Sequence, residues 1–163
     1  EFIKVAKSMQ ERSFVLIRPE SAVPVWPEIE LPKNTTLFTG ELKDGMRQCS
    51  AALVCSGTAT LEVALLGVPQ LVVYRANPIS LAIAKRFVKV NYISLPNLIL
   101  DAGALPELLQ EAPGGASLLQ RLRVLIEDPS DQFIAYAKLR KAIEEKDPAA
   151  TAAEHILAVS SEA

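Results

Sequence analysis

The sequence predicts an α/β fold, a Rossmann-like domain of three layers in which helices cover a parallel sheet. Short apolar runs of strand length alternate with segments whose apolar residues recur at helical spacing. Two of these runs, Ala51–Cys55 and Gln70–Tyr74, are continuously apolar in their middle, as is typical of parallel strands covered on both faces. Half of the 163 residues are apolar, which is enough for a substantial core.

Each element follows from its local pattern. Strands are predicted at four short apolar runs, Phe14–Ile17, Thr35–Thr39, Ala51–Cys55 and Gln70–Tyr74. Helices are predicted over Phe2–Met9, Glu41–Cys49, Ala59–Leu66, Ser80–Val90, Leu105–Gln110, Leu118–Glu127, Gln132–Glu145 and Ala149–Val159. Tyr92–Leu98 is expected to be extended and to end in a turn, and Gly45 should weaken its helix.

These elements divide the chain into a Rossmann-like domain over residues 1–110 and a helical extension over 111–163. The first helix has no capping residue ahead of it, which suggests a fragment of a longer protein.

Composition excludes several classes of function. The net charge of −2 is too close to neutral for nucleic-acid binding by charge alone. Cys49 and Cys55 do not have the spacing of metal ligands, and neither a metal nor a cofactor is expected. The single histidine, His155, is far from both cysteines in the sequence, which argues against a Cys–His nucleophile. No G-x-S-x-G motif is present, so a serine hydrolase has no support either. No run of 18 apolar residues predicts a membrane span.

The turn Ser56–Thr58 is the main candidate for ligand binding. It joins a predicted strand to a predicted helix, and ligands of open α/β sheets bind just past the carboxyl ends of strands. Free backbone N–H groups and the positive end of the helix dipole suit a phosphate there. Gly57 lets a ligand approach the main chain, although small residues in such turns also serve close strand–helix packing.

Glu62 adds to this interpretation. No residue that could cap the helix stands three positions before it, so it is not part of a capping box. A carboxylate near a phosphate turn can accept hydrogen bonds from ribose hydroxyls, as acids do in dinucleotide folds. The alternative is an exposed acid that complements the helix dipole.

The predicted helix Ser80–Val90 carries Lys85, Arg86 and Lys89 beside apolar residues. Such a face can rest on anionic lipid headgroups. It can equally be the ordinary exposed face of an amphipathic helix.

Four strings, in this order, resemble the lipid-A-disaccharide synthase family: CSGTATLEVALLGVP, VVYRANPIS, AKRFVKVNYISLPNLI and PELLQ. The resemblance runs from about Leu37 to Gln110. Four strings in the right order and at the right spacing are far more specific than a single glycine turn.

The resemblance implies the carboxyl-terminal, nucleotide-holding half of an inverting GT-B glycosyltransferase, in which two Rossmann-like domains face each other across a cleft. The family transfers 2,3-diacylglucosamine from its UDP derivative to 2,3-diacylglucosamine 1-phosphate, giving lipid A disaccharide 1-phosphate and UDP. Its general base lies in the amino-terminal half, so no catalytic residue is assigned here and the chain alone is expected to be inactive. The expected partners are the UDP-sugar donor, the acylated acceptor and the amino-terminal domain. The expected location is the cytoplasm, on the inner face of the inner membrane.

The resemblance implies contacts with the UDP-sugar at nine residues: Ser56, Gly57, Thr58, Thr60, Glu62, Arg75, Asn97, Glu107 and Gln110. The first four would hold the diphosphate and ease departure of UDP, and Glu62 would bind the ribose. Arg75 would pair with phosphate or sugar, or be a surface arginine. Asn97 would bind the donor sugar, or form an Asx turn. Glu107 and Gln110 are expected on a helix face near the cleft.

The sequence departs from the family in two places. A glycine-rich, PGSR-like loop should precede Phe2 and is absent. Asp101–Ala104 stands where the family often has a Gly-Arg-Glu-like stretch.

Two other functions stay open at this point. One is half of a sugar-nucleotide epimerase of similar two-domain fold. The other is a non-catalytic binding or assembly module, with Leu118–Val159 as its working surface. An apolar face on those helices could join two copies into a homodimer.

Overall fold

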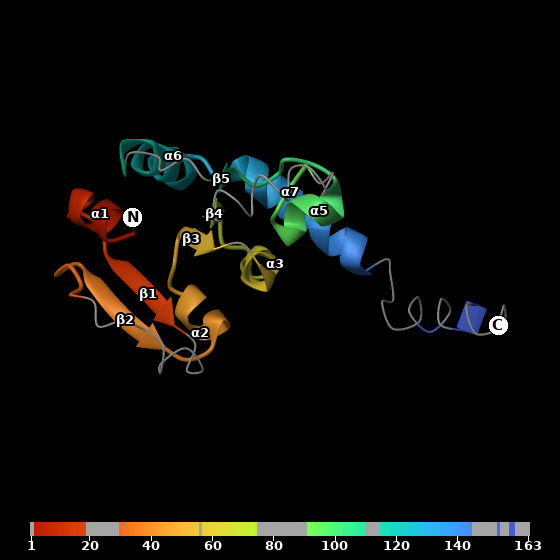
Figure 1. Ribbon diagram of the computed structural model, residues 1–163, viewed down its shortest axis with the longest axis horizontal. Coiled ribbons are helices and arrows are strands. Elements are labelled where there is room, and N and C mark those ends of the chain that lie inside the picture. Colours follow the sequence, from red (N-terminus) through yellow and green to blue (C-terminus); the bar gives the residue numbers. More distant parts are fainter. Residues whose placement is uncertain are drawn as a thin grey trace, which may run out of the picture.

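The computed structural model describes residues 2–18, 30–55, 57–74, 91–109, 115–144, 153 and 157–158. The elements in chain order are α1 (Phe2–Ser8), β1 (Phe14–Arg18), β2 (Thr35–Thr39), α2 (Leu42–Met46), β3 (Ala52–Cys55), α3 (Thr58–Leu66), β4 (Gln70–Tyr74), α5 (Leu95–Leu100), β5 (Glu107–Leu109), α6 (Gly115–Glu127) and α7 (Ser130–Glu144). Figure 1 shows this alternation of helices and strands, and the predicted α/β class is confirmed.

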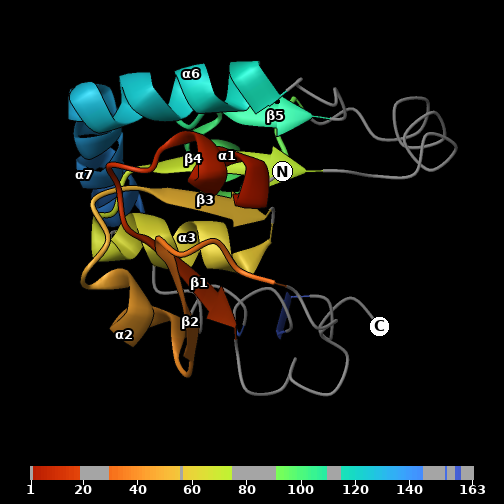
Figure 2. The same ribbon diagram turned by 90° about the vertical axis from the view of Figure 1, so that its left-hand side faces the viewer.

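All strand pairs among the described residues are parallel, as predicted. β1 pairs with β2, and β3, β4 and β5 form a second sheet in that order. Figure 2 shows α1 and α6 over one face of the strands and α2 and α3 over the other. The carboxyl ends of β3, β4 and β5 therefore lie at one common edge.

Three apolar clusters fill the space between these layers. One joins α1 and α6 to the strands through Val5, Leu71 and Leu122. A second, with Val54 and Val63, lies between β3, α2 and α3. In a third, Ala64, Tyr136 and Leu139 join α3 to α7. Figure 1 shows α6 and α7 beside the sheet, so both belong to the packed domain.

Two sequence predictions were wrong. The predicted helix Leu105–Gln110 contains the strand β5, Glu107–Leu109. A strand this short carries too little pattern to be told from a helical turn, and its pairing with β4 decides its conformation. Conversely, the predicted turn within Tyr92–Leu98 is the start of α5, where Pro96 occupies the first turn, a position that helices favour for proline.

The predicted helix Ser80–Val90 lies outside the described residues. So does most of the predicted helix Ala149–Val159.

A buried polar network fixes α7 against β4. The Gln132 side chain accepts a hydrogen bond from the Gln70 backbone N–H and donates one to the Gln70 carbonyl oxygen, both at 2.8 Å. The Tyr136 hydroxyl donates to Gln132 Oε1 at 2.7 Å, with the Val68 carbonyl oxygen 3.0 Å away. Burial raises the pKa of Tyr136 to about 12, although Gln70 acts to lower it.

Gly45 allows α2 to lie close against β1. A Cβ atom at Gly45 would lie 2.7 Å from Ile17 Cδ1 and 2.9 Å from Ile17 Cγ1. The close approach of α2 and β1 accounts for a glycine in the middle of a short helix, where its low helix propensity is a disadvantage.

We expect Gly45→Ala to lower the free energy of unfolding by about 1 kcal/mol, because overpacking outweighs the gain in helix propensity. The control is Gly103→Ala, whose Cβ would make an ordinary 3.5 Å contact with Tyr92. It should stay within about 0.5 kcal/mol of the parent chain. Thermal unfolding measures both, and equal stability of the two variants would contradict the packing argument.

Tyr136 makes the stability of the fold depend on pH in the alkaline range. An unfolded tyrosine ionises near pH 10, whereas folded Tyr136 keeps its proton to about pH 12. The unfolded state therefore binds fewer protons in this window, and stability falls as the pH rises through it.

We expect Tyr136→Phe to start less stable by about 1 kcal/mol at neutral pH, because it loses the hydroxyl's hydrogen bonds. Between pH 10 and 12 it should lose less stability than the parent chain, by on the order of 2 kcal/mol. Urea titrations at stepped pH give the difference, and all other groups titrate equally in both chains. Parallel pH profiles would show that Tyr136 does not carry this dependence.

Candidate functional site

The turn between β3 and α3 is open at its glycine. Gly57 has φ +139° and ψ −164°, and a Cβ built there would meet nothing within 4 Å. Gly57 and Thr58 are exposed, and α3 begins at Thr58. Because Gly57 has no side chain to cap α3, the helix presents its positive end to whatever fills the open space.

Thr60 holds this turn from beneath. Its side chain is fully buried, and its hydroxyl donates to the Gly57 carbonyl oxygen at 2.7 Å. Its backbone N–H donates to the same oxygen at 3.1 Å. The Thr60 carbonyl in turn accepts a hydrogen bond from Gln70 Nε2 at 2.8 Å. Thr60 thus positions the main chain of Gly57 instead of presenting its own hydroxyl at the surface.

Glu62 lies one turn into α3 and is exposed. Gly57 and Thr58 are thus exposed just past the carboxyl end of β3, and Glu62 is exposed one turn further along α3. This arrangement can bind an anion through backbone N–H groups, while the carboxylate remains available to hydroxyl donors.

Asn97 and Glu107 belong to a second group, which joins α5 to β5. The Glu107 carboxylate accepts hydrogen bonds from the backbone N–H groups of Ile93 and Ser94, from the Ser94 hydroxyl and from Asn97 Nδ2, at 2.6 to 3.0 Å for the shortest contact of each donor. Asn97 is 1% exposed, and it also donates to the Leu105 carbonyl and accepts from the Leu105 N–H. Both amide hydrogens of Asn97 are therefore in use within the protein.

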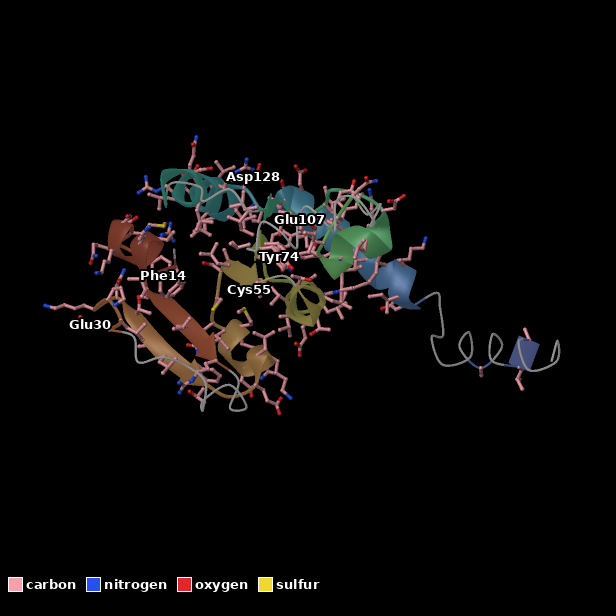
Figure 3. The ribbon with its side chains drawn as sticks, viewed as in Figure 1. Phe14, Glu30, Cys55, Tyr74, Glu107 and Asp128 are labelled. Carbon is pink, nitrogen blue, oxygen red and sulfur yellow. The ribbon has the colours of Figure 1, made fainter. Side chains whose placement is uncertain are left out.

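Figure 3 labels Cys55, Tyr74 and Glu107, one residue on each of the three neighbouring strands β3, β4 and β5. Cys55 and Tyr74 are exposed at the carboxyl ends of their strands, beside the candidate turn. Sequence analysis did not single out Tyr74 or Ser94. The sequence did hold one indication for Tyr74, because this residue ends a predicted strand and ligands of open α/β sheets bind at the carboxyl ends of strands.

Three predicted site residues, Ser56, Arg75 and Gln110, lie outside the described residues, as do Lys85, Arg86 and Lys89. Of the remaining six, Gly57, Thr58 and Thr60 lie at the start of α3, and Glu62 lies one turn further along the same helix. It brings Asn97 and Glu107 together in the second group. Glu107 lies on a strand, so the helix face predicted for it was wrong.

No group of three or more His, Cys, Asp or Glu side chains in the part of the chain that the structure describes could hold a metal ion. Cys49 and Cys55 are free thiols, and burial raises the pKa of Cys49. No described helix is both long and apolar enough to cross a bilayer.

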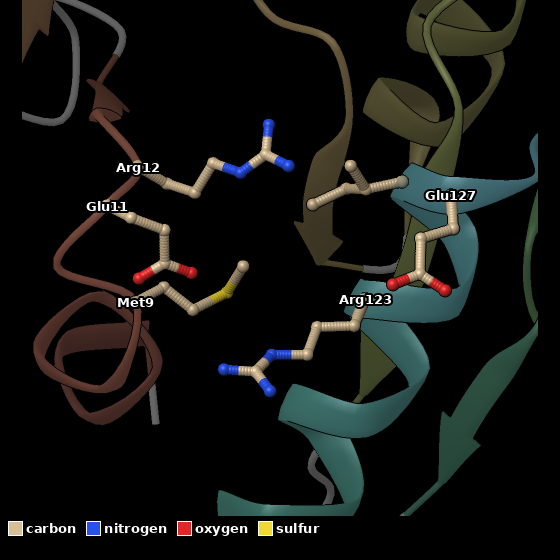
Figure 4. A pocket seen from close by; sticks show the side chains of 6 residues that line it. Met9, Glu11, Arg12, Arg123 and Glu127 are labelled. Carbon is tan, nitrogen blue, oxygen red and sulfur yellow. The ribbon is translucent and has the colours of Figure 1, made fainter.

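A cavity of about 270 Å³ lies at the opposite, amino edge of the strands. Figure 4 shows Met9, Glu11 and Arg12, from the segment before β1, facing Arg123 and Glu127 near the end of α6. Ligands of open α/β sheets bind at the carboxyl edge. This cavity is therefore separate from the candidate turn.

Comparison with known proteins finds matches that include the candidate turn and the residues around it. The family model described as lipid-A-disaccharide synthetase matches residues 22–160. The lipid-A-disaccharide synthase of Pseudomonas entomophila is 39% identical over 124 residues, which cover 76% of this chain and 33% of that protein. A Pseudomonas putida synthase is 38% identical over 130 residues, 80% of this chain and 34% of the relative.

The Pseudomonas aeruginosa synthase is 39% identical over 126 residues, 77% of this chain and 33% of the relative. The chain thus spans about a third of the length of the curated relatives that it matches. The family model covers most of the chain, including the candidate turn and the group around Glu107. The chain belongs to the lipid-A-disaccharide synthase family.

Proposed function

We propose that this chain is the donor-binding part of a glycosyltransferase that makes lipid A disaccharide. The donor would be UDP-2,3-diacylglucosamine, the acceptor 2,3-diacylglucosamine 1-phosphate, and the products lipid A disaccharide 1-phosphate and UDP. The chain matches about a third of each relative named above, and in this proposal the opposite wall of the cleft and the general base would belong to the rest of the protein. The chain alone is then expected to bind nucleotide without transferring sugar.

The observation that carries this proposal is the open glycine at the start of α3. A Cβ at Gly57 would meet no atom within 4 Å, so a diphosphate has room to approach the main chain. The backbone N–H groups of Gly57 and Thr58, together with the positive end of α3, would stabilise its negative charge. The same donors would stabilise the charge that grows on the departing UDP oxygen in the transition state.

Each remaining predicted site residue has a part in this proposal. Thr60 would act through the turn that it fixes, and exposed Glu62 would accept hydrogen bonds from the ribose hydroxyls. Asn97 and Glu107 would hold the α5–β5 connection beside the site, since their polar groups are engaged within the protein. Ser56, Arg75 and Gln110 keep the donor contacts that the sequence predicts.

The acylated substrates would bring the enzyme to a membrane surface. Lys85, Arg86 and Lys89 are the proposed contacts with anionic headgroups. The proposed location is the cytoplasmic face of the inner membrane.

The test of the nucleotide site is a calorimetric titration of the chain with UDP. We expect Glu62→Ala to weaken binding by about 10- to 100-fold, the equivalent of one hydrogen bond to a charged group. The matched control is Glu144→Ala, which removes another exposed glutamate, at the end of α7, and should leave the affinity unchanged. Equal affinities for all three chains would remove Glu62 from the ribose site.

The supporting role of Glu107 makes a separate prediction. Glu107→Gln replaces an acceptor oxygen by an NH₂ group among donors, so we expect the free energy of unfolding to fall by about 1–3 kcal/mol. The control is Asp101→Asn, which makes the same change of charge at an exposed position with φ +46°, a conformation that asparagine tolerates. Urea unfolding should separate the two variants; a stable Glu107→Gln chain would contradict the supporting role.

A further inference from the structure

Tyr74 is an exposed aromatic residue at the carboxyl edge of the sheet, and the proposed function gives it no part. It is the last residue of β4 and is 37% exposed, whereas the first three residues of that strand are buried. Figure 3 shows it between Cys55 on β3 and Glu107 on β5. Ligands of open α/β sheets bind at this edge, and aromatic side chains commonly line their sites.

The alternation of side chains along β4 places Tyr74 on the same face of the sheet as α3. Val72 packs in the cluster that joins α3 to α7, and Val73 packs in the cluster under α1 and α6. Successive side chains of a strand point to opposite faces, so Tyr74 shares the face of Val72. Because Cys55 pairs with Val73, Tyr74 lies one step past the end of β3, beside the turn from which α3 begins.

The region around Glu107 lies on the other side of Tyr74. Glu107 pairs with Val72, so its side chain is on this same face of the sheet. Its carboxylate holds the start of α5 through the backbone N–H groups of Ile93 and Ser94. α5 is also in contact with α3. Tyr74 is therefore positioned between the start of α3 and the start of α5.

The polar groups around Tyr74 differ in whether they are available to a ligand. Asn97 and Glu107 use their hydrogen bonds within the protein. The Tyr74 hydroxyl has no hydrogen-bond partner among the residues that the structure describes, in contrast to the hydroxyl of Tyr136, which donates to Gln132. Tyr74 thus offers an apolar ring and an unused hydroxyl donor at one exposed place.

The covalent order of the proposed donor decides which part of it reaches Tyr74. The proposed function puts the ribose at Glu62 and the diphosphate at Gly57 and Thr58. Glu62 is on the exposed side of α3, whereas Val63 beside it is buried toward the sheet. The hexose is bonded to the end of the diphosphate opposite the ribose. It would therefore extend from the turn over the end of β4, where Tyr74 lies.

We propose that Tyr74 is a specificity-determining residue for the hexose of the donor. This inference rests on the proposed function, because the position of the nucleotide is taken from it. The ring of Tyr74 packs against the apolar face of the sugar, and its hydroxyl donates a hydrogen bond to a sugar oxygen. Tyr74 makes no contact with the UDP portion, so it distinguishes a nucleotide that carries a hexose from one that does not.

Calorimetric titration of the full-length protein with two ligands tests this role. UDP reports on the nucleotide site alone, and UDP-N-acetylglucosamine, a water-soluble probe, adds the hexose. We expect Tyr74→Ala to leave the affinity for UDP unchanged and to weaken binding of the sugar nucleotide by about 10- to 100-fold. Tyr74→Phe keeps the ring and loses one neutral hydrogen bond, so it should weaken binding of the sugar nucleotide by about 3- to 10-fold.

The matched control is Phe133→Ala, which removes an exposed aromatic ring from α7, next to the Gln132 side chain that bonds the amino end of β4. It should leave both affinities unchanged. Tyr74→Phe keeps the sugar-specific loss measurable even if Tyr74→Ala does not fold.

The two ligands separate failure of this inference from failure of the proposed function. A parent protein that does not bind UDP would contradict the nucleotide site, and this inference with it. Where the parent binds UDP, two results overturn the role of Tyr74 alone. One is an equal loss of affinity for both ligands, which indicates contact with the nucleotide. The other is an unchanged affinity for both.

Discussion

The parallel pairing of β3 with β4 is the constraint on which the rest of the structure depends. It aligns Cys55 with Val73 and so brings the ends of both strands to one edge. Backbone groups that leave the sheet there are no longer bonded within it, and the helix that follows β3 points its positive end at the same edge. The anion binding that we propose at Gly57 would therefore be a consequence of strand alignment, with only a secondary part for side-chain chemistry.

A series of hydrogen bonds ties Gly57 to the core. Thr60 is bonded to the Gly57 carbonyl, and Gln70 bonds the Thr60 carbonyl. Gln70 is in turn fixed by Gln132 and lies within hydrogen-bond distance of Tyr136, both on α7. A site held by such buried bonds keeps its donors in place before a ligand arrives, which lowers the entropy cost of binding.

Sequence reasoning reached the fold class and the candidate turn because both rest on local signals. The four apolar runs and the small residues between Cys55 and Ala59 are read from neighbouring letters. The α5–β5 region was different. Three residues of β5 are too few for periodicity, and pairing with β4 decided the outcome.

Asn97 and Glu107 show a second limit of the sequence. A motif can indicate that these residues belong together. It cannot show whether their polar atoms face a ligand or one another, because that depends on how α5 packs against β5. The division of the described strands into two sheets was likewise beyond local patterns, since β1 and β3 are about 35 residues apart in the sequence.

The bonds between Gln70 and α7 have a consequence for how the protein can be dissected. The helices after residue 110 supply Leu118, Leu122 and Leu139 to the apolar clusters, and the Gln132 side chain occupies both backbone hydrogen-bonding groups of Gln70. Trimming the chain before α7 would remove the hydrogen bonds that support Gln70, and through it Thr60 and Gly57, as well as shorten the domain. A shortened chain for crystallography, or for testing the proposed nucleotide site, must therefore extend through Glu144.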